Sequence, residues 1–228
     1  AAGLIDVALK HPNVKLIANA LGTPPTDVVE KVQGAGLLIG ALAGSVKHAL
    51  NHKAAGLDFI ICQGSEGGGH TGDVGSIVLW PEVIDAVSPI PVLAAGGIMT
   101  GRQMAACMAM GAAGVWTGSV WLATVESETT EIFREKMIAA SSRDAIRSKG
   151  RTGKPARQLR SVWTDAWDRG PDSPGALPMP LQSIISRDAF NSIDRAAAAG
   201  NGWLSHGLYR GLASGADLVV GALENEAG

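Results

Sequence analysis

A histidine follows three consecutive glycines in the segment CQGSEGGGHTGDVG, which spans residues 62–75. An imidazole titrates near neutral pH, so His70 is a candidate general base or hydrogen-bond donor at a ligand. The glycines before it permit a left-handed backbone and let the chain approach a ligand closely. Glu66 lies four residues earlier, but the intervening glycines disfavour the helix that a zinc-type pair at this spacing requires. We therefore expect a ligand loop without a metal, with a flexible linker as the alternative.

Two further glycine-bearing turns follow in chain order. The segment AAGGIMTGRQ places Gly96 and Gly97 directly after an apolar run, and GVWTGS places Gly118 and Ser119 after the next one. Backbone amides at turns that lead into a helix suit an anion. Two successive turns of this kind form the common phosphate site of the last two strands of a βα barrel. The three loops together therefore predict a site for a phosphorylated ligand.

The elements that would position these loops are short apolar runs separated by helix-like stretches. The runs begin at five positions: Asn13, Leu37, Leu57, Ile90 and Gly114. Near-continuous apolar runs are typical of parallel strands buried on both faces, and Ser45 and Thr100 are good caps for intervening helices. A TIM-type (β/α)₈ barrel needs eight strands and typically about 250 residues. We therefore predict an α/β fold of this barrel type, incomplete at its N-terminus, with a mostly helical C-terminal extension.

The alternation of strands and helices stops after about residue 125. Residues 126–148 have the pattern of one long amphipathic helix, and residues 149–182 are rich in Gly, Pro, Trp and Arg, as in an extended excursion. The tail from Ser183 is predicted to be mostly helical and ends in the apolar ADLVVGAL. This organisation predicts two parts: residues 1–125, the C-terminal portion of a βα barrel with the binding loops, and residues 126–228, an extension packing on it.

Other candidate residues have simpler interpretations. Four basic side chains lie close together in sequence: Arg151, Lys154, Arg157 and Arg160. They form either a solvated segment or a lid that neutralises a phosphate or an anionic substrate. His48 and His52 could share a helix face, but without an evident third ligand we expect that face to be solvated. Trp163 and Trp167 are predicted to pack their segment down.

Composition narrows the function classes. The chain has 228 residues, 46% of them hydrophobic, and a formal net charge of −2, which argues against a nucleic-acid or anionic-membrane partner driven by bulk charge. Cys62 and Cys107 lie in apolar surroundings and predict buried free thiols in a reducing compartment. With no apolar run of membrane-spanning length and no signal-peptide pattern, we expect a cytoplasmic protein, and a homo-oligomer stays open.

The ordered set QGSEGGGHTG, PVLAAGGI and GVWTGS resembles the FMN-dependent nitronate monooxygenases, also known as 2-nitropropane dioxygenases. The segments TGKPARQLRSVWTDAW and PMPLQ are similar to a subgroup with an extended C-terminal segment, so the resemblance covers most of residues 13–182. It implies a TIM barrel that holds FMN and oxidises nitronates, and in some members nitroalkanes, with dioxygen. The implied partners are therefore a small nitronate or nitroalkane and dioxygen.

The resemblance assigns His70 as the base that removes the α-proton of a nitroalkane. The residues implied to bind FMN, the later ones around its phosphate, are Gln63, Gly68, Gly69, Gly96, Gly97, Trp116, Thr117, Gly118 and Ser119. This chain departs from the family pattern at Gly67, where alanine is usual, and nothing in it matches the flavin contacts of the family's first strands. Three alternatives stay open: an FMN-dependent enoyl-acyl-carrier-protein reductase, a phosphosugar-type barrel enzyme without flavin, and a non-catalytic flavin-barrel fragment.

Overall fold

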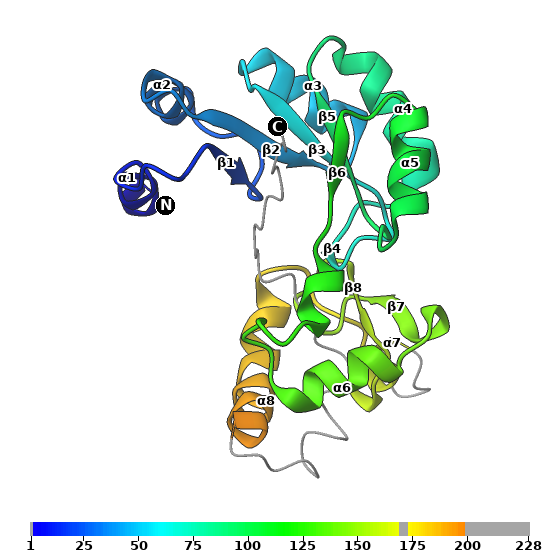
Figure 1. Cartoon of the computed structure of the whole chain (residues 1–228). Helices are drawn as coiled ribbons and strands as arrows, with labels where there is room; N and C mark the ends of the chain where they lie inside the picture. Colours follow the sequence, from blue (N-terminus) through cyan, green and yellow to red (C-terminus); the bar gives the residue numbers. More distant parts are fainter. Residues whose placement is uncertain (1, 169–172, 199–228) are drawn as a thin grey trace. The chain divides into compact units, whose positions relative to one another are not determined.

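The computed structural model describes residues 2–168 and 173–198, and the chain divides into two compact units (Figure 1). Unit 1 comprises residues 2–66 and 72–117, and unit 2 comprises the described residues of 67–71 and 118–198. The unit boundaries therefore fall inside the first and third of the predicted ligand loops. The sequence-based division at residue 125 stays a prediction.

Unit 1 contains a sheet of five parallel strands in the order β1-β2-β3-β5-β6. Their bounds are β1 Leu16–Asn19, β2 Leu38–Ala43, β3 Phe59–Gln63, β5 Val92–Ala95 and β6 Gly114–Trp116. Each strand lies within one of the five apolar runs, so the predicted strands and the α/β class are confirmed. Within the described residues the sheet does not close into a barrel.

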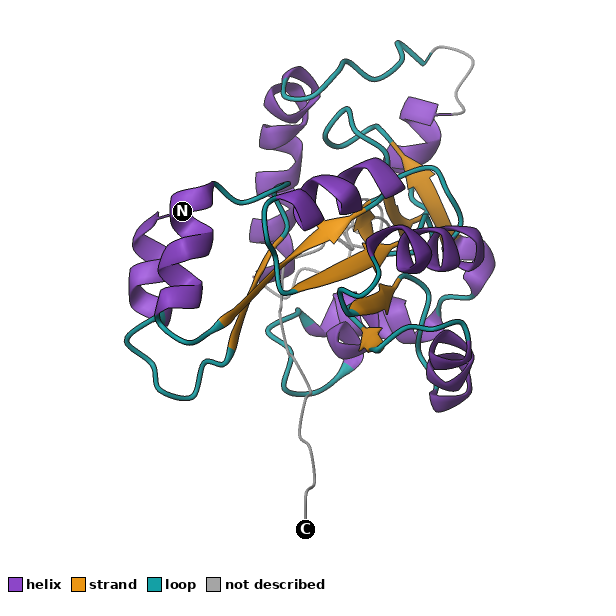
Figure 2. Cartoon of the chain, turned by 90° about the horizontal axis from the view of Figure 1, so that it is seen from above, coloured by secondary structure: helices purple, strands orange, loops and turns teal. Residues whose placement is uncertain are grey.

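Helices alternate with these strands along the chain. Figure 2 draws the helices in purple and the strands in orange. Their bounds are α1 Ala2–Ala8, α2 Thr26–Gly34, α3 Val46–Ala54, α4 Ser76–Val87 and α5 Gly101–Ala109. Both predicted caps are confirmed. The Ser45 hydroxyl accepts the amide of His48 at 3.2 Å, and Thr100 forms a reciprocal capping box with Gln103. These caps fix where α3 and α5 begin relative to the strand ends before them.

Side chains of β3 enter apolar clusters on both faces of the sheet. On one face, Ile60 and Cys62 pack with Trp80 in a cluster that includes side chains of α3, α4 and α5. On the other face, Phe59 and Ile61 form a second cluster with residues of β5 and β6. Alternate residues of β3 therefore enter different cores, as the two-residue period of a strand requires.

Both cysteines are buried free thiols, as predicted. Burial raises the pKa of Cys62 to about 12, and the same cause raises the pKa of Cys107. Each thiol therefore stays protonated at neutral pH and packs as a small apolar group.

Unit 2 is built around a three-stranded antiparallel sheet in the order β4-β8-β7. Its elements are β4 Gly69–His70, η1 Ser119–Ala123, α6 Glu131–Ala139, η2 Ser142–Asp144, β7 Ala145–Ser148, β8 Ala156–Leu159, α7 Val162–Asp168 and α8 Leu181–Ala198. The glycine loop thus supplies the edge strand of a sheet whose other strands come from far along the chain. In both units, no described helix is long and apolar enough to cross a membrane.

The prediction of one long helix over residues 126–148 is wrong. The Thr130 hydroxyl caps a shorter helix, α6, which ends at Ala139. Ser141 and Asp144 then form a capping box around a single 3₁₀ turn, and residues 145–148 run as strand β7. Hydroxyl and carboxylate side chains that compete for backbone groups end the helix here, and pairing with β8 stabilises the extended conformation that follows.

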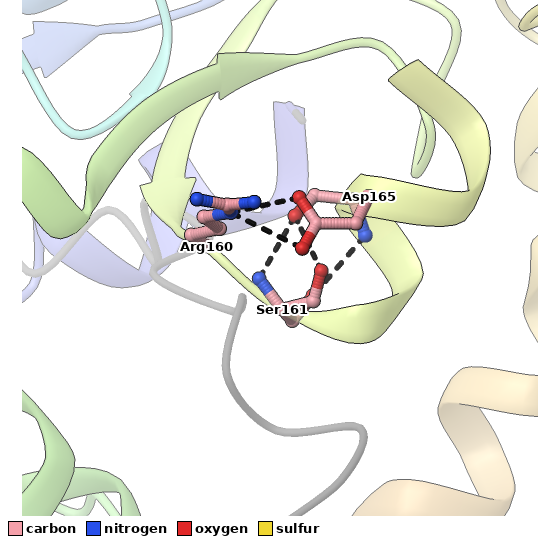
Figure 3. A network of polar contacts seen from close by, with 4 residues as sticks. Arg160, Ser161 and Asp165 are labelled. Carbon is pink, nitrogen blue, oxygen red and sulfur yellow. Dashed lines mark hydrogen bonds and ion pairs between the residues drawn. The ribbon is translucent and has the colours of Figure 1, made fainter. Parts of the chain in front are cut away.

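Aromatic contacts hold the segment after β8. The rings of Trp163 and Trp167 lie 5.7 Å apart, and Trp163 meets Phe190 of α8 edge-on at 5.2 Å. These contacts confirm that both tryptophans pack their segment down. Figure 3 shows the start of α7, where the Arg160 Nε donates to both carboxylate oxygens of Asp165 at 2.8 and 3.1 Å. Helix α8 confirms the first part of the predicted helical tail, and ADLVVGAL lies outside the described residues.

Candidate functional site

His70 lies on the edge strand of the unit 2 sheet. Its backbone pairs with Ala156 of β8, and Gly69 pairs with Arg157. The amide of Thr71 continues this contact by donating to the Pro155 carbonyl at 3.3 Å. The imidazole is exposed, and its Nε2 lies 2.8 Å from the Thr152 hydroxyl. A strand ladder therefore holds the backbone of His70, while a hydroxyl orients its ring.

The surroundings of His70 favour the neutral imidazole. Partial withdrawal of the ring from water lowers its pKa below the ordinary value of 6.5, and the positive charges of Lys154 and Arg151 lower the pKa further. Both effects disfavour the imidazolium cation. At pH 7 the ring therefore carries one free lone pair, which is what a general base needs.

Thr152, which the sequence did not single out, is the hydrogen-bonding partner of the His70 ring. Its hydroxyl oxygen accepts the Lys154 amide at 3.3 Å and lies at the same distance from the Lys154 carbonyl, to which it can donate. This local turn leaves the oxygen able to accept the Nε2–H of His70, so that Nδ1 becomes the unprotonated nitrogen. Only the antiparallel pairing brings Thr152 to His70 across 82 positions of sequence, and no local pattern signals it.

The predicted basic cluster separates into different roles. The positive charges of Arg151 and Lys154 act on His70, and the predicted neutralisation of a bound anion stays a prediction. The Arg157 Nη1 donates to the Ala145 carbonyl at 3.0 Å across the sheet. Arg160 forms the exposed ion pair with Asp165. Arg151 and Lys154 therefore contribute to the potential at His70, and the Arg151 guanidinium also lies 4.9 Å from the centroid of the Phe190 ring.

Gly68 and Ser119 are brought together within unit 2. A Cβ atom at Gly68 would lie 2.5 Å from the Ser119 Oγ, so a larger residue there would require the Ser119 hydroxyl to move. Gly69 has a φ of 77°, a left-handed conformation that also favours glycine. Gly118 is exposed, and a Cβ atom there would meet nothing within 4 Å. Among the predicted site residues of unit 2, Gly68 therefore packs against Ser119, whereas Gly118 has free space around it.

In unit 1 the end of β3 is fixed by side chains of α4. The Trp80 Nε1 donates to the carbonyls of Cys62 and Ala95 at 3.1 and 3.2 Å, which ties α4 to the ends of β3 and β5. The Glu66 carboxylate accepts both the amide and the hydroxyl of Ser76 at 2.8 and 2.7 Å. Gln63, the last residue of β3, stands immediately before this anchored turn. The backbone that leads into the glycine loop is therefore rigidly placed.

Gly96 and Gly97 form the turn after β5. Both have left-handed backbone angles, with φ values of 104° and 74°. A Cβ atom at Gly97 would lie 3.0 Å from the Cβ of Glu66. In the described part of the chain, neither glycine amide donates a hydrogen bond to another backbone group. Successive amides in such a turn are suited to an anion, and the phosphate-binding role of these glycines stays a prediction.

Trp116 and Thr117 end unit 1. Trp116 is partly buried and packs against the cluster of Phe59, Ile61 and Ala95. Its side chain therefore contributes to the sheet face away from α4. The predicted flavin contacts of Trp116 and Thr117 stay predictions.

His52 corrects one expectation from the sequence. It is 1% exposed instead of solvated. Its Nδ1 lies 2.9 Å from the Thr23 hydroxyl and its Nε2 lies 3.0 Å from the Leu42 carbonyl. Because a carbonyl can only accept, Nε2 carries the proton and Nδ1 accepts from Thr23. His52 is thus a core histidine with both nitrogens satisfied.

Comparison with known proteins identifies the family. The nitronate monooxygenase family model matches residues 2–213. A Mycobacterium tuberculosis protein named as a monooxygenase is 57% identical, over 85% of this chain and 51% of that protein. A Staphylococcus aureus protein named as a nitronate monooxygenase is 34% identical, over 85% of this chain and 55% of that protein. The chain thus spans about half the length of the curated relatives it matches.

Two solved structures are similar to the same extent. A nitroalkane oxidase from Streptomyces ansochromogenes has a TM-score of 0.71 and 32% identity, over 86% of this chain and 57% of that chain. FabK from Thermotoga maritima has the same TM-score and identity, over 86% of this chain and 60% of that chain. These likenesses support the barrel type of α/β fold and the family match. The chain belongs to the nitronate monooxygenase family.

Proposed function

We propose that this chain binds FMN and takes part in the oxidation of nitronates and nitroalkanes by dioxygen, with His70 as the general base. The observation that carries the proposal is the state of His70. Its ring is exposed, its Nε2 is engaged by Thr152, and nearby positive charges help to keep it neutral. A neutral, oriented imidazole can remove an acidic proton.

The proton in question is the one on the carbon next to a nitro group. Its removal by the Nδ1 lone pair of His70 leaves a nitronate, whose negative charge is spread over the two nitro oxygens. Lys154 and Arg151, which lie close enough to act on His70, would favour that charge. After the transfer, the hydrogen bond to Thr152 keeps the imidazolium in place.

The residues of unit 1 fit the phosphate of FMN. The amides of Gly96 and Gly97 are available in a left-handed turn, and the start of α5 follows shortly after them. Gln63, Trp116 and Thr117, at or just after neighbouring strand ends, would complete the contacts from this unit. The predicted FMN contacts of unit 2 are Gly68, Gly69, Gly118 and Ser119. When bound, the flavin would accept electrons from the nitronate and pass them to dioxygen.

The first experiment measures the visible absorbance of the purified chain, where an oxidised flavin band is expected. The second replaces His70 with asparagine. His70→Asn should retain flavin and lose about 10²- to 10⁴-fold in turnover of nitroethane. Oxidation of ethyl nitronate should change much less, because its proton is already gone. Equal rates with nitroethane in the variant and the wild type would rule out the base assignment.

An FMN-dependent enoyl reductase is the second candidate, because FabK is as similar in structure as the nitroalkane oxidase. The two functions differ in their electron donor. Under anaerobic conditions, rapid bleaching of the flavin by NADH would favour the reductase. Bleaching by ethyl nitronate but not by NADH would favour the nitronate monooxygenase.

A further inference from the structure

Gln158 of β8 is a buried side chain without a hydrogen-bonding partner. It is 4% exposed, and its amide Nε2 has no partner within the described residues. Thr71, which follows His70, is 7% exposed, and its hydroxyl also has no hydrogen-bonding partner within the described residues. Such groups are rare in folded proteins, because a buried donor that gives up water without gaining a partner destabilises the fold. Two of them, one on β8 and one directly after β4, call for an explanation.

Gln182 in the same unit is a contrasting case. It is also fully buried, but its Nε2 donates to the Gly150 carbonyl at 2.7 Å and its Oε1 accepts the Leu177 amide at 3.0 Å. The Gln182 amide therefore links two segments of the fold. Gln158 makes no such link, so packing and hydrogen bonding do not explain why an amide stands at this position.

The register of the sheet places Gln158 on the same face as His70. His70 is directly opposite Ala156, so the side chains of both project from one face, and Gln158 two residues further projects from that face as well. Two residues of antiparallel strand cover about 7 Å. Continuing the register puts Gln158 opposite Gly68, over which the Ser119 hydroxyl lies. A small molecule whose reacting carbon lies at His70 would therefore share this face of the sheet with Gln158, two residues further along β8 than the partner of His70.

The charges around this face of the sheet determine which ligand group would be favoured next to the Gln158 amide. Lys154 and Arg151 both make the potential at His70 positive. An oxygen bound there is therefore favoured when it is anionic, and an amide N–H is a suitable donor to such an oxygen. The two nitro oxygens of a nitronate have this charge.

We propose that Gln158 is a substrate-binding residue whose side-chain amide donates a hydrogen bond to an oxygen of the nitro or nitronate group presented to His70. This proposal rests on the proposed function for the identity of the substrate. It assigns the unpartnered donor a partner that is present only in the complex. It also explains why an amide, and not an apolar side chain, occupies a buried position.

The test uses inorganic nitrate, a planar anion with the same kind of oxygens, as a probe of the purified full chain. Gln158→Met keeps the length of the side chain and removes its polar atoms, and Gln182→Met is the matched control. We expect Gln158→Met to melt at or above the wild-type temperature, because it removes an unsatisfied group. We expect its nitrate affinity, measured by thermal shift, to fall about tenfold. Gln182→Met should melt lower and keep its nitrate affinity.

A second variant covers the case in which methionine disturbs the sheet. Gln158→Glu keeps the shape and has no N–H donor, and it should also bind nitrate at least tenfold more weakly. Nitrate affinity within twofold of the wild type in both variants would overturn the proposal, as would a wild type that binds no nitrate. A fall in melting temperature for Gln158→Met as large as that of Gln182→Met would also overturn it. Failure of the wild type to oxidise ethyl nitronate, with Gln158-dependent nitrate binding intact, would instead reject the proposed function alone.

Discussion

Two histidines, one in each unit, show how the same side chain serves opposite purposes. His52 in unit 1 is buried, and both its nitrogens are bonded to fixed partners. His70 in unit 2 is exposed, and only its Nε2 has a partner among the described residues. Withdrawal from water is the main cause that lowers the pKa of each. The shared pKa direction therefore says little about function, whereas the number of satisfied nitrogens separates a structural histidine from a chemically available one.

The largest expected effect on stability belongs to His52. Replacing it with leucine keeps an apolar volume but leaves the Leu42 carbonyl and the Thr23 hydroxyl without their partner. We expect His52→Leu to lower the free energy of unfolding by about 2 kcal/mol or more, measured by urea titration. His70→Leu, the matched control on an exposed strand edge, should change it by no more than about 0.5 kcal/mol. Equal losses in the two variants would remove the distinction between the two histidines.

The dependence of stability on pH gives a second test of the role of His52. A histidine whose pKa is lowered in the folded state stabilises fully above its unfolded pKa, near 6.5, and that contribution is lost as the pH falls from there toward the folded value. Wild-type stability should therefore fall below about pH 6.5. The fall should be smaller in His52→Leu, since leucine does not titrate. An identical pH dependence in wild type and variant would show that His52 is not the group responsible.

Gly97 tests whether the unit 1 turn is as rigid as its angles indicate. Alanine there must adopt a φ near 74° and press its methyl group on Glu66. We expect Gly97→Ala to cost about 1–2 kcal/mol of stability and to weaken retention of flavin, measured by absorbance after gel filtration. Gly101→Ala, which meets nothing within 4 Å at the start of α5, should be neutral or stabilising. Normal flavin content in Gly97→Ala would separate this turn from the cofactor.

The sequence predicts unit 1 better than unit 2 for a physical reason. A parallel strand buried on both faces is a short apolar run, and Ser45 and Thr100 mark helix starts within a few residues, so the signals are local. The contact between His70 and Thr152 depends on antiparallel pairing across a long stretch of chain, which no local pattern encodes. The local pattern favours a helix over the residues of β7, because these residues follow a helical segment. Their extended conformation depends instead on pairing with β8.

The same limit applies to the site residues. His70 and the glycine turns are visible in the sequence because glycine before histidine and glycine after a strand each stand within one segment. Thr152 and Gln158 are not, because a threonine in a turn and a glutamine in a strand are ordinary until their neighbours are known. The expectation for His52 is wrong because burial of α3 against Leu42 and Thr23 depends on tertiary packing.

The smallest expected effect concerns how His70 is held. Thr152→Val keeps the shape of the side chain and removes the hydroxyl that lies 2.8 Å from Nε2. We expect turnover of nitroethane to fall about tenfold, the effect of one lost hydrogen bond, and oxidation of ethyl nitronate to stay nearly unchanged. In the wild type the nitroethane rate should decline as the pH falls through a pKa below 6.5, because protonation removes the base.

Thr152→Ser supplies the control, since it retains the hydroxyl and should recover most of the lost rate. A structural defect would instead lower the rates with both nitroethane and ethyl nitronate, and it would do so whether or not residue 152 carries a hydroxyl. If valine and serine behave alike with nitroethane, the ladder of β4 and β8 alone is enough to orient His70. In that case the difference between the two histidines lies in exposure, and the satisfied nitrogen of His70 has no part in it.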